Sequence, residues 1–356
     1  MYKKFFMGIA AMAALTLVSC SSDDLNSLSD NSSKNEAISF DGYLGRSAVA
    51  VNGSRGSVEK KDQLKTDGFG VFGNYNSTDG KTFGANLFNN EKVTSSSSTE
   101  PVTWTYTNTK YWPTQGHIDF LAYAPYEGGK TLKDNTSSCI DFIVEGDVAK
   151  QKDLLWANAD GQTKENGKVT FNFAPALSRL GYTVKLNEDY SNATITLNKI
   201  TLAGSVDEKT KAFYKTGTID LSKTSSEGLW TNQSSNDKQN FNWFSETQPA
   251  TIITSASTPN PDTKYLFVIP QDFSKTEENA DKLYVIVDYT IKYTKYNNGE
   301  MAEMKSTVSS QIVRNFSQGK AYTINLTIGL TPIEFNANVT EWDPINGDDI
   351  NINSWN

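Results

Sequence analysis

The sequence predicts an all-β protein of two antiparallel β-sandwich domains in tandem, preceded by a signal peptide and a tether. Short segments in which apolar and polar residues alternate recur from position 37 onward, and turn residues separate them. Alternation with a period of two at regular spacing is typical of β-sandwiches. Aromatic residues make up 12% of the chain, and Gly, Thr, Ser and Asn are abundant, which favours strands and turns over helices.

The first 19 residues have the parts of a lipoprotein signal peptide. Lys3 and Lys4 supply positive charge, and the apolar run at 5–18 is shorter than the about 20 residues that a membrane-spanning helix needs. Residues 17–20, Leu-Val-Ser-Cys, then resemble the lipobox, in which small residues precede an acceptor cysteine. We expect cleavage before Cys20 and its lipidation, for instance with palmitate, which would anchor the chain in the outer membrane. An ordinary signal peptide with an incidental cysteine is the alternative.

Residues 20–36 are predicted to form a disordered tether. Ser, Asn and Asp dominate this stretch, and few of its side chains could enter a core. Asp23 and Asp24 resemble the acidic surface-export signal of lipoproteins in the Bacteroides group. The remaining chain is long enough for two domains, which we place at 37–172 and 173–356.

Several segments carry the strand pattern. In chain order they are residues 38–43, 68–72, 102–106, 118–123, 194–202, 265–269, 283–293, 307–313 and 321–328. The strongest prediction is residues 282–292, after which Asn297-Asn298-Gly299 predicts a tight hairpin turn into a strand that starts near Met301. Helix is predicted only as two short segments, and two polar tracts predict surface loops: helix at 149–156 and 174–180, loops at 94–99 and 224–240.

The charge and the cysteines exclude several classes of protein. A net charge of -8 argues against nucleic-acid binding, because no basic stripe is available to neutralise phosphates. The chain has two cysteines. Because lipid would occupy Cys20, we expect Cys139 to be an unpaired, buried cysteine, and no disulfide framework is available.

No catalytic machinery is recognisable in the sequence. The single histidine, His117, is incompatible with His-rich zinc sites and weakens any Ser-His-Asp arrangement. Since a strand pattern follows it, we expect a surface histidine at a strand end. The nucleophile elbow, the phosphate loop and the dinucleotide fingerprint are absent from the sequence. We therefore expect that the protein is not an enzyme and needs no cofactor or metal.

Three other interpretations have less support. Two carboxylates could meet in space as a glycosidase pair, but no motif selects them. The acidic residues at 343–349 lack the spacing of an EF-hand, which favours a solvated chain end over a calcium site. Tryptophans could stack against sugars, but Trp104, Trp112 and Trp156 lie in strand-like or apolar contexts, so we predict that they are core residues.

Six groups of residues occur in order along the chain. They are Ile38-Ser39-Phe40 with Gly45-Arg46-Ser47; Phe-Gly-Val-Phe-Gly-Asn-Tyr at 69–75; Lys110-Tyr111-Trp112-Pro113 with the segment 118–126; Gln-Lys-Asp-Leu-Leu-Trp-Ala at 151–157; the segment 169–180; and 319–326 with Val-Thr-Glu-Trp at 339–342. Together, behind a lipobox, they resemble the fimbrillin family, the subunits of type V pili in Bacteroides-like bacteria. Pro175 departs from the family pattern, which often has histidine there, and we expect this to concern packing only.

The resemblance implies two transthyretin-like β-sandwiches and a mechanism of polymerisation. In such pilins the lipoprotein reaches the outer membrane as a precursor, and an arginine-specific surface protease removes the first strand. A strand of a neighbouring subunit then fills the open groove, because an unpaired sheet edge beside an emptied apolar groove binds an extended segment. The interface is heterologous, so repeated addition gives a fibre and no closed ring.

Two arginines and the C-terminal tail are the candidate elements for this mechanism. Cleavage after Arg46, before Ser47, would release the strand at 38–43, and cleavage between Arg55 and Gly56 is the second choice. Ordinary loop arginines are the alternative. For the donor strand we favour the tail after Trp342, with a frayed end as the alternative; its apolar residues are Ile345, Ile350, Ile352 and Trp355.

The sequence thus predicts a stalk or tip subunit of a type V-like pilus. Its partners would be other pilin subunits, the protease and, through lipid, the outer membrane. The alternative is a monomeric surface lipoprotein that binds glycans or host molecules, and a glycan-degrading enzyme has less support. A pilin needs a removable strand and a donor, whereas an exposed aromatic cleft would favour glycan binding.

Overall fold

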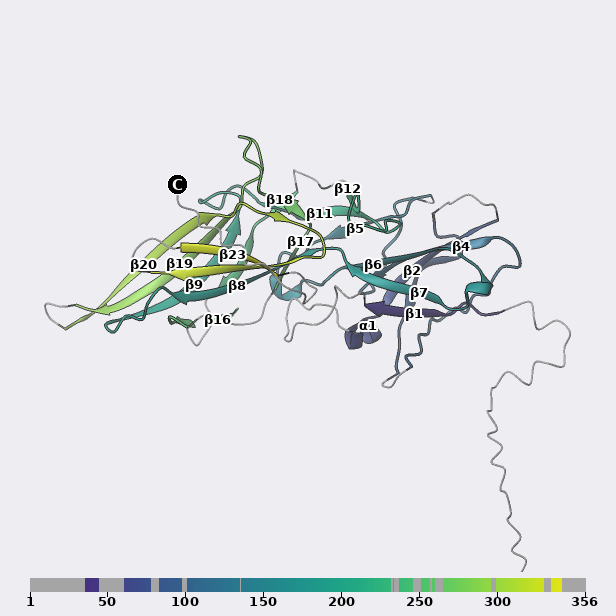
Figure 1. Ribbon diagram of the computed structural model, residues 1–356, viewed down its shortest axis with the longest axis horizontal. Coiled ribbons are helices and arrows are strands. Elements are labelled where there is room, and N and C mark those ends of the chain that lie inside the picture. Colours follow the sequence, from purple (N-terminus) through teal and green to yellow (C-terminus); the bar gives the residue numbers. More distant parts are fainter. Residues whose placement is uncertain are drawn as a thin grey trace, which may run out of the picture. The chain divides into compact units, whose positions relative to one another are not determined.

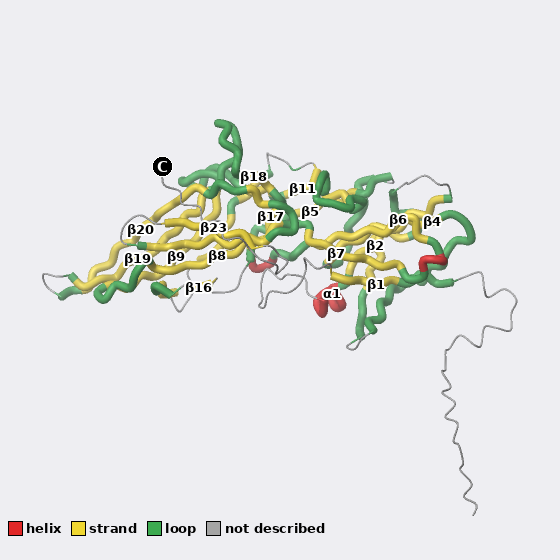
Figure 2. Tube along the Cα trace, viewed as in Figure 1, coloured by secondary structure: helices red, strands yellow, loops and turns green. Residues whose placement is uncertain are grey.

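Strands make up nearly all regular structure in the computed structural model (Figures 1 and 2). It describes residues 36–44, 61–77, 83–97, 101–134, 136–231, 233, 237–245, 251–256, 258–259, 265–295, 299–329 and 334–340. The described residues from Ala37 onward form one compact unit. Over the described part of the chain, no helix has the length and apolar character needed to cross a bilayer.

The strands nearest the N-terminus form one six-stranded sheet. Its order is β1 (Phe40–Leu44), β7 (Val169–Pro175), β6 (Leu155–Gln162), β4 (His117–Ala124), β2 (Phe69–Asn76) and β3 (Phe88–Val93). The neighbours pair antiparallel except for β1 and β7, which run parallel. A short helix, α1 (Lys61–Asp67), precedes β2.

Alternation along the strands divides this sheet into two buried faces. On β4, Ile118 and Phe120 belong to one apolar cluster, whereas Leu121 and Tyr123 belong to a second and larger one. This follows from the strand geometry, because successive side chains point to opposite faces. Both faces are covered, which explains why β4 is buried along almost its whole length.

Two further sheets enclose the larger cluster. One has the order β14 (Phe241–Ser245), β9 (Ala193–Ala203), β19 (Tyr284–Thr294), β20 (Met301–Gln311), with β15 (Thr251–Ile253) also on β9. The other has the order β16 (Thr258–Pro259), β8 (Ser178–Leu186), β22 (Ala321–Ile328), β23 (Glu334–Thr340), with β17 (Leu266–Val268) also on β8. The Tyr182 ring of β8 packs edge-on against the Trp243 ring of β14, with centroids 4.9 Å apart. The two sheets therefore form a β-sandwich with a shared core.

Three small sheets complete the described structure. They are β12–β11–β5 (Trp230–Thr231, Thr216–Asp220, Cys139–Ile143), β10–β13 (Phe213–Tyr214, Lys238–Gln239) and β18–β21 (Gln271–Asp272, Asn315–Phe316). The β5–β11 ladder joins the parts of the chain before and after residue 172. Two hydrogen bonds do the same: Phe267 N–H to Gln151 Oε1 at 2.8 Å, and Asn158 Nδ2–H to the Leu221 carbonyl at 2.8 Å. The division at 172/173 stays a prediction.

Most of the predicted strands are confirmed. The hairpin is confirmed as well, because Thr294 of β19 pairs with Met301 at the start of β20 and Gly299 has a φ of 69°. Trp104, Trp112 and Trp156 are buried, as predicted. His117 begins β4 and lies 3.4 Å from a carboxylate oxygen of buried Asp119.

Four local predictions are wrong. Residues 174–180 form the end of β7 and the start of β8, and 149–156 form a 3₁₀ turn (Val148–Lys150) followed by the start of β6. In 102–106 only Thr105 makes a β-bridge, to Thr94. This loop alternates because Trp104 is buried while its two neighbours are more exposed, so burial without a strand produced the pattern. The predicted loop at 224–240 contains the short strands β12 and β13.

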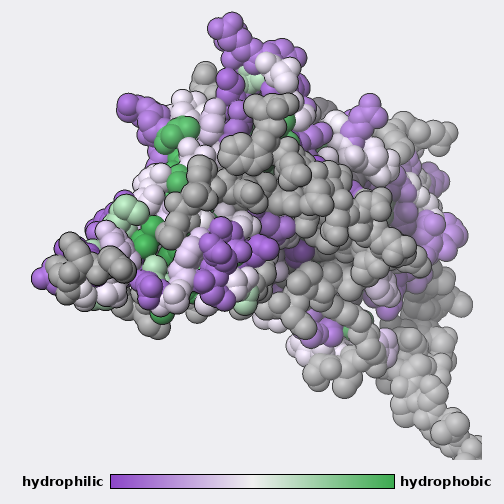
Figure 3. Space-filling model, turned by 60° about the vertical axis from the view of Figure 1, so that its left-hand side comes forward, coloured by the Kyte–Doolittle hydropathy of each residue, from purple (hydrophilic) through white to green (hydrophobic). Residues whose placement is uncertain are grey.

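The described surface is mostly hydrophilic on the face shown in Figure 3, where hydrophobic residues (green) gather in small areas only. The free cysteine Cys139 lies at the start of β5 and is half-buried, so it is less enclosed than the sequence led us to expect.

Candidate functional site

The candidate site is the groove that holds the first strand, β1, at one end of the six-stranded sheet. Phe40 to Leu44 pair in parallel register with Val169 to Phe173 of β7. The Val169 N–H donates a 2.9 Å hydrogen bond to the Ser39 carbonyl. Since β7 is the only described strand that pairs with β1, the first strand is a terminal element whose loss would leave the rest of the sheet order intact.

The side chains of the first strand alternate between the groove and the surface. Ile38 and Phe40 are buried in the smaller apolar cluster, and Leu44 packs against it. Tyr43, on the other face, is half exposed. The apolar, polar order that predicted a strand at 38–43 therefore also identifies which residues enter the groove.

Phe40 is the main apolar anchor of the first strand. It is 2% exposed and contacts four aromatic rings, with centroid separations of 5.4 to 5.8 Å, from Tyr106, Phe88, Phe120 and Phe171. Three of these contacts are edge-on and the one with Phe171 is stacked, both arrangements that aromatic pairs favour. Such a site prefers an aromatic side chain of one size and orientation.

The groove narrows next to Gly42. A β-carbon at this position would lie 3.1 Å from the Phe69 ring and 3.4 Å from the Trp104 ring. The 3.1 Å contact requires the Phe69 ring to shift by a few tenths of an ångström, and this ring is held within the cluster. The groove therefore accepts a large residue at Phe40 and only a minimal one two positions later.

The loop at 101–112 closes the groove over the start of the strand. The Ile38 N–H donates to the Lys110 carbonyl at 2.8 Å, and Ala37 forms a β-bridge with Tyr111. The Tyr106 hydroxyl donates to the Ile38 carbonyl at 2.8 Å. Burial raises the pKa of Tyr106, so this hydroxyl stays protonated and able to donate at neutral pH.

Charge contributes little to holding the first strand. Among the described residues, the ion pair of this strand joins the Asp41 carboxylate to the Lys168 ammonium, at a distance of 3.8 Å. The ammonium side chain is more than half exposed, and surface pairs of this kind typically contribute less than about 1 kcal/mol. Apolar burial and backbone pairing therefore dominate the binding of the strand.

The processing, lipidation and donor residues predicted from the sequence lie outside the described residues. They are Cys20, Arg46, Ser47, Arg55, Gly56, Ile345, Ile350, Ile352 and Trp355. The structure does describe the elements that flank the two arginines in the sequence. β1 ends at Leu44 and α1 begins at Lys61, so both arginines fall between these two elements.

Sequence reasoning missed the receiving side of this site. Phe88 was not named, and Tyr106 and Lys110 appeared only within larger segments, although these three residues form the wall and the clamp around the first strand. The available signal was the alternation of aromatic residues at 102–106. It indicates that side chains are buried but does not indicate which residues they contact. Parallel pairing of β1 with β7 has no local signal, because the two strands are distant in the sequence.

Comparison with known proteins agrees with this architecture. A family model described as fimbrillin-like matches residues 57–342. The structure is similar to that of a fimbrial protein from Bacteroides vulgatus, with a TM-score of 0.65 and 21% identity, covering 86% of this chain and 99% of that one. This likeness shows the fold.

Other solved structures are more distant. A protein from Bacteroides uniformis, proposed to act in cell adhesion, has a TM-score of 0.47 and 16% identity over 86% of this chain and 98% of that one. No curated protein matches the sequence.

The family model spans most of the chain, from before β2 to after β23. On that match, the protein belongs to the fimbrillin-like family.

Proposed function

We propose that this chain is a structural subunit, stalk or tip, of a type V-like pilus that assembles by removal of the first strand and strand exchange between subunits. It reaches the outer membrane as a precursor anchored through Cys20 and becomes extracellular after processing. Membership of the fimbrillin-like family supports a pilus or adhesion subunit at the cell surface. The observation that carries the finer proposal is a terminal strand whose apolar residues lie deep in an aromatic groove.

Removal of β1 would convert a filled groove into a binding site. The edge of β7 would lose its backbone partner, and the rings around Phe40 would lose theirs. Burying a side chain such as Phe40 or Ile38 contributes about 1.5–3 kcal/mol, so the empty groove is a strong template for another extended segment. The same surface is an aggregation hazard if it stays open, which makes its occupation by a neighbouring subunit favourable.

The direction of the first strand favours exchange. β1 pairs with β7 in the parallel orientation, which is slightly less stable per residue than antiparallel pairing. A donor strand that enters antiparallel to β7 would therefore form the better ladder with the same groove. Because donor and groove are different surfaces, each addition leaves a new groove or donor free and the assembly extends as a fibre.

The two candidate arginines are well placed in the sequence for releasing the first strand. Arg46 is the second residue after β1 ends, and Arg55 lies before α1 begins. Cleavage after either residue, before Ser47 or before Gly56, separates β1 from everything that follows. An arginine-specific surface protease is the partner that this step requires.

The tail after Trp342 is our candidate donor. It follows β23, which is the end strand of its own sheet and pairs with β22 on one side. Ile350 and Ile352 alternate as the pockets along a strand require, and Ile345 and Trp355 extend the apolar pattern. In this proposal the partner subunits bind one another through this tail and the groove vacated by β1.

The proposal is tested by sequencing the N-terminus of protein recovered from the cell surface and from polymers. We expect a start at Ser47 or Gly56. The double variant R46K/R55K keeps the charge but removes the arginine-specific sites, and it should remain a lipidated, unpolymerised precursor. R314K is the matched control and should assemble normally. The proposal is overturned if polymerised wild-type protein has an acylated Cys20 as its sole N-terminus. If the wild-type protein is found only as a monomer with an acylated Cys20, a monomeric binding lipoprotein is favoured.

A further inference from the structure

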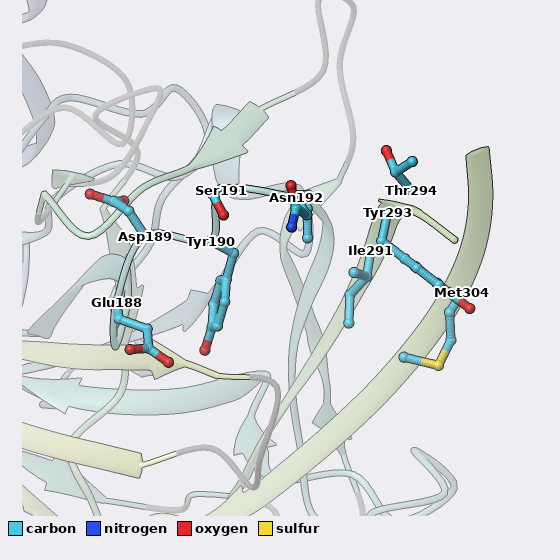
Figure 4. Close-up of a pocket in the computed structure, with 10 residues that line it drawn as sticks. Glu188, Asp189, Tyr190, Ser191, Asn192, Ile291, Tyr293, Thr294 and Met304 are labelled. Carbon is cyan, nitrogen blue, oxygen red and sulfur yellow. The ribbon is translucent and has the colours of Figure 1, made fainter. Parts of the chain in front are cut away.

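A second hollow lies far from β1 in the sequence, and the pilus mechanism does not use it. It is an open cavity of about 580 Å³ between the turn that joins β8 to β9 and the adjoining ends of β19 and β20 (Figure 4). In this view Tyr190 stands on one side, and Ile291, Tyr293 and Met304 stand on the other. Glu188, Asp189 and Asn192 of the turn supply polar groups to the same cavity.

The apolar wall of the cavity is a continuation of the sandwich core. Ile291 belongs to the core cluster, and Tyr293 lies on the same face of β19 two residues later. Met304 is the cross-strand partner of Ile291 on β20 and so shares that face. Tyr293 is 38% exposed and Met304 is 49% exposed. The inner face of the hairpin therefore presents one aromatic and one flexible apolar side chain to solvent.

The polar wall is held in place before any ligand arrives. The Asp189 carboxylate accepts hydrogen bonds from the N–H and the hydroxyl of Ser255, at 2.8 and 2.6 Å. The Tyr190 hydroxyl donates to Asn187 Oδ1 at 2.6 Å, and the Thr294 N–H donates to the Asn192 carbonyl at 3.2 Å. A turn fixed at several points loses little conformational entropy when it binds a ligand.

The chemistry of the lining selects against anions. Among the residues that the structure describes, Glu188 and Asp189 are the charged residues that line the cavity, and no lysine or arginine joins them. The two donors from Ser255 lower the pKa of Asp189, so this carboxylate is ionised at neutral pH. A phosphate, a sulfate or an acidic sugar would therefore meet a repulsive field.

A neutral sugar matches the remaining groups. The C–H face of a pyranose can pack on the Tyr293 ring and the Met304 side chain, while the polar residues of the turn, Asn192 among them, line the rest of the cavity (Figure 4). Ligand cavities are usually lined by an apolar surface with a small number of precisely placed polar groups. A lysine side chain would use the carboxylates but would leave the apolar wall largely unoccupied. We propose that this cavity binds a neutral pyranose unit of a glycan, which would give the subunit an adhesive function of its own.

The test uses the full chain as an uncleaved monomer, so its outcome is independent of strand exchange. The probes are lactose, cellobiose and N,N′-diacetylchitobiose, with 3′-sialyllactose as the anionic probe and Nα-acetyl-lysine methylamide as the cationic one. Saturation-transfer NMR detects binding and calorimetric titration measures it. We expect at least one neutral disaccharide to bind with a Kd of about 1 mM, and the sialylated sugar to bind more weakly.

Two variants assign the binding to the cavity. Y293A should weaken binding of the neutral sugar about tenfold, and Y111A, which removes another half-exposed tyrosine, should leave it unchanged. E188Q retains the shape of the rim and should reduce affinity for the lysine probe more than for the sugar. The proposal is overturned if no neutral disaccharide binds, if the lysine probe alone binds, or if Y293A binds the sugar as the wild type does while its circular dichroism shows native folding.

Discussion

The Tyr106 hydroxyl donates a 2.8 Å hydrogen bond to the carbonyl of Ile38, whose own N–H donates to the Lys110 carbonyl. The Lys110 N–H in turn donates to the Tyr106 hydroxyl at 3.1 Å. Both backbone polar groups of Ile38 are thus held by one loop. This loop, together with the aromatic groove, sets how firmly the first strand is retained.

Removing that hydroxyl should loosen the strand without unfolding the protein. Y106F keeps the ring against Phe40 but leaves the Ile38 carbonyl without its donor, a change of about 0.5–1.5 kcal/mol. We expect amide hydrogen exchange at residues 37–44 to accelerate about two- to tenfold. Y111F serves as the control on the same loop. Unchanged exchange in Y106F would show that the clamp does not retain the strand.

Stability should fall at alkaline pH because of two tyrosines, one buried and one partly buried. Burial raises the pKa of Tyr106 and, more strongly, of Tyr123 above the ordinary value of 10.0. Below pH 10 both states hold these protons, so the full stability is present. As the pH rises above 10 the unfolded chain loses them first, so the free energy of unfolding decreases until the folded pKa is passed.

Urea unfolding between pH 9 and pH 11.5 measures this decrease. Y123F removes the more strongly shifted group and should give a shallower dependence on pH, although its lost hydrogen bonds to Asn90 and Glu127 lower stability at every pH. A slope in Y123F equal to that of the wild type would exclude Tyr123 as a source of the effect.

The narrow part of the groove can be tested at Gly42. G42V should destabilise the protein by about 1–3 kcal/mol, because the added carbons meet the Phe69 and Trp104 rings. G128V is a matched control, since a β-carbon at Gly128 has no atom within 4 Å. Urea unfolding compares the two, and limited proteolysis should release the first strand faster from G42V alone. Equal stabilities of the two variants would mean that the groove can widen.

The aromatic anchor should decide which peptides the emptied groove binds. F40A removes the contacts with four rings, a change of about 3–5 kcal/mol. A synthetic peptide of residues 37–44 should therefore block polymerisation of cleaved protein, and its F40A form should need at least about a hundredfold higher concentration. A peptide with Tyr43→Ala, an exposed position, is the control. Equal inhibition by all three peptides would contradict the assigned anchor.

The sequence predicts the strands better than it predicts their partners. Alternation identified residues 38–43 because one side chain in two is buried there, whatever the neighbouring strand is. The same rule failed at 102–106, where a loop buries Trp104 against the sheet without joining it. Conversely, helix α1 was not predicted. Among its described residues Leu64 is the only buried side chain, so the segment shows no helical periodicity of apolar residues.

The cavity beside Tyr190 shows a different limit. Residues 187–192 read as an ordinary polar turn, and Ile291 and Tyr293 read as part of a strong strand. Their encounter depends on the packing of distant segments, for which one sequence has no signal. The first strand was easier to predict than the groove that holds it. Phe40 lies in an alternating segment that is visible in the local sequence, whereas its pocket is formed by Phe88, Tyr106 and residues of two other strands.

In the proposed fibre every subunit would bear tension, and the β5–β11 ladder has a consequence for how this chain would carry it. β5 precedes residue 172 and β11 follows it, with five residue pairs between Thr216–Asp220 and Cys139–Ile143. A force applied to the two ends of the chain cannot separate the segments before and after residue 172 until this ladder opens. The ladder is therefore a mechanical crosslink made without a disulfide, and it re-forms without redox chemistry once the tension is released.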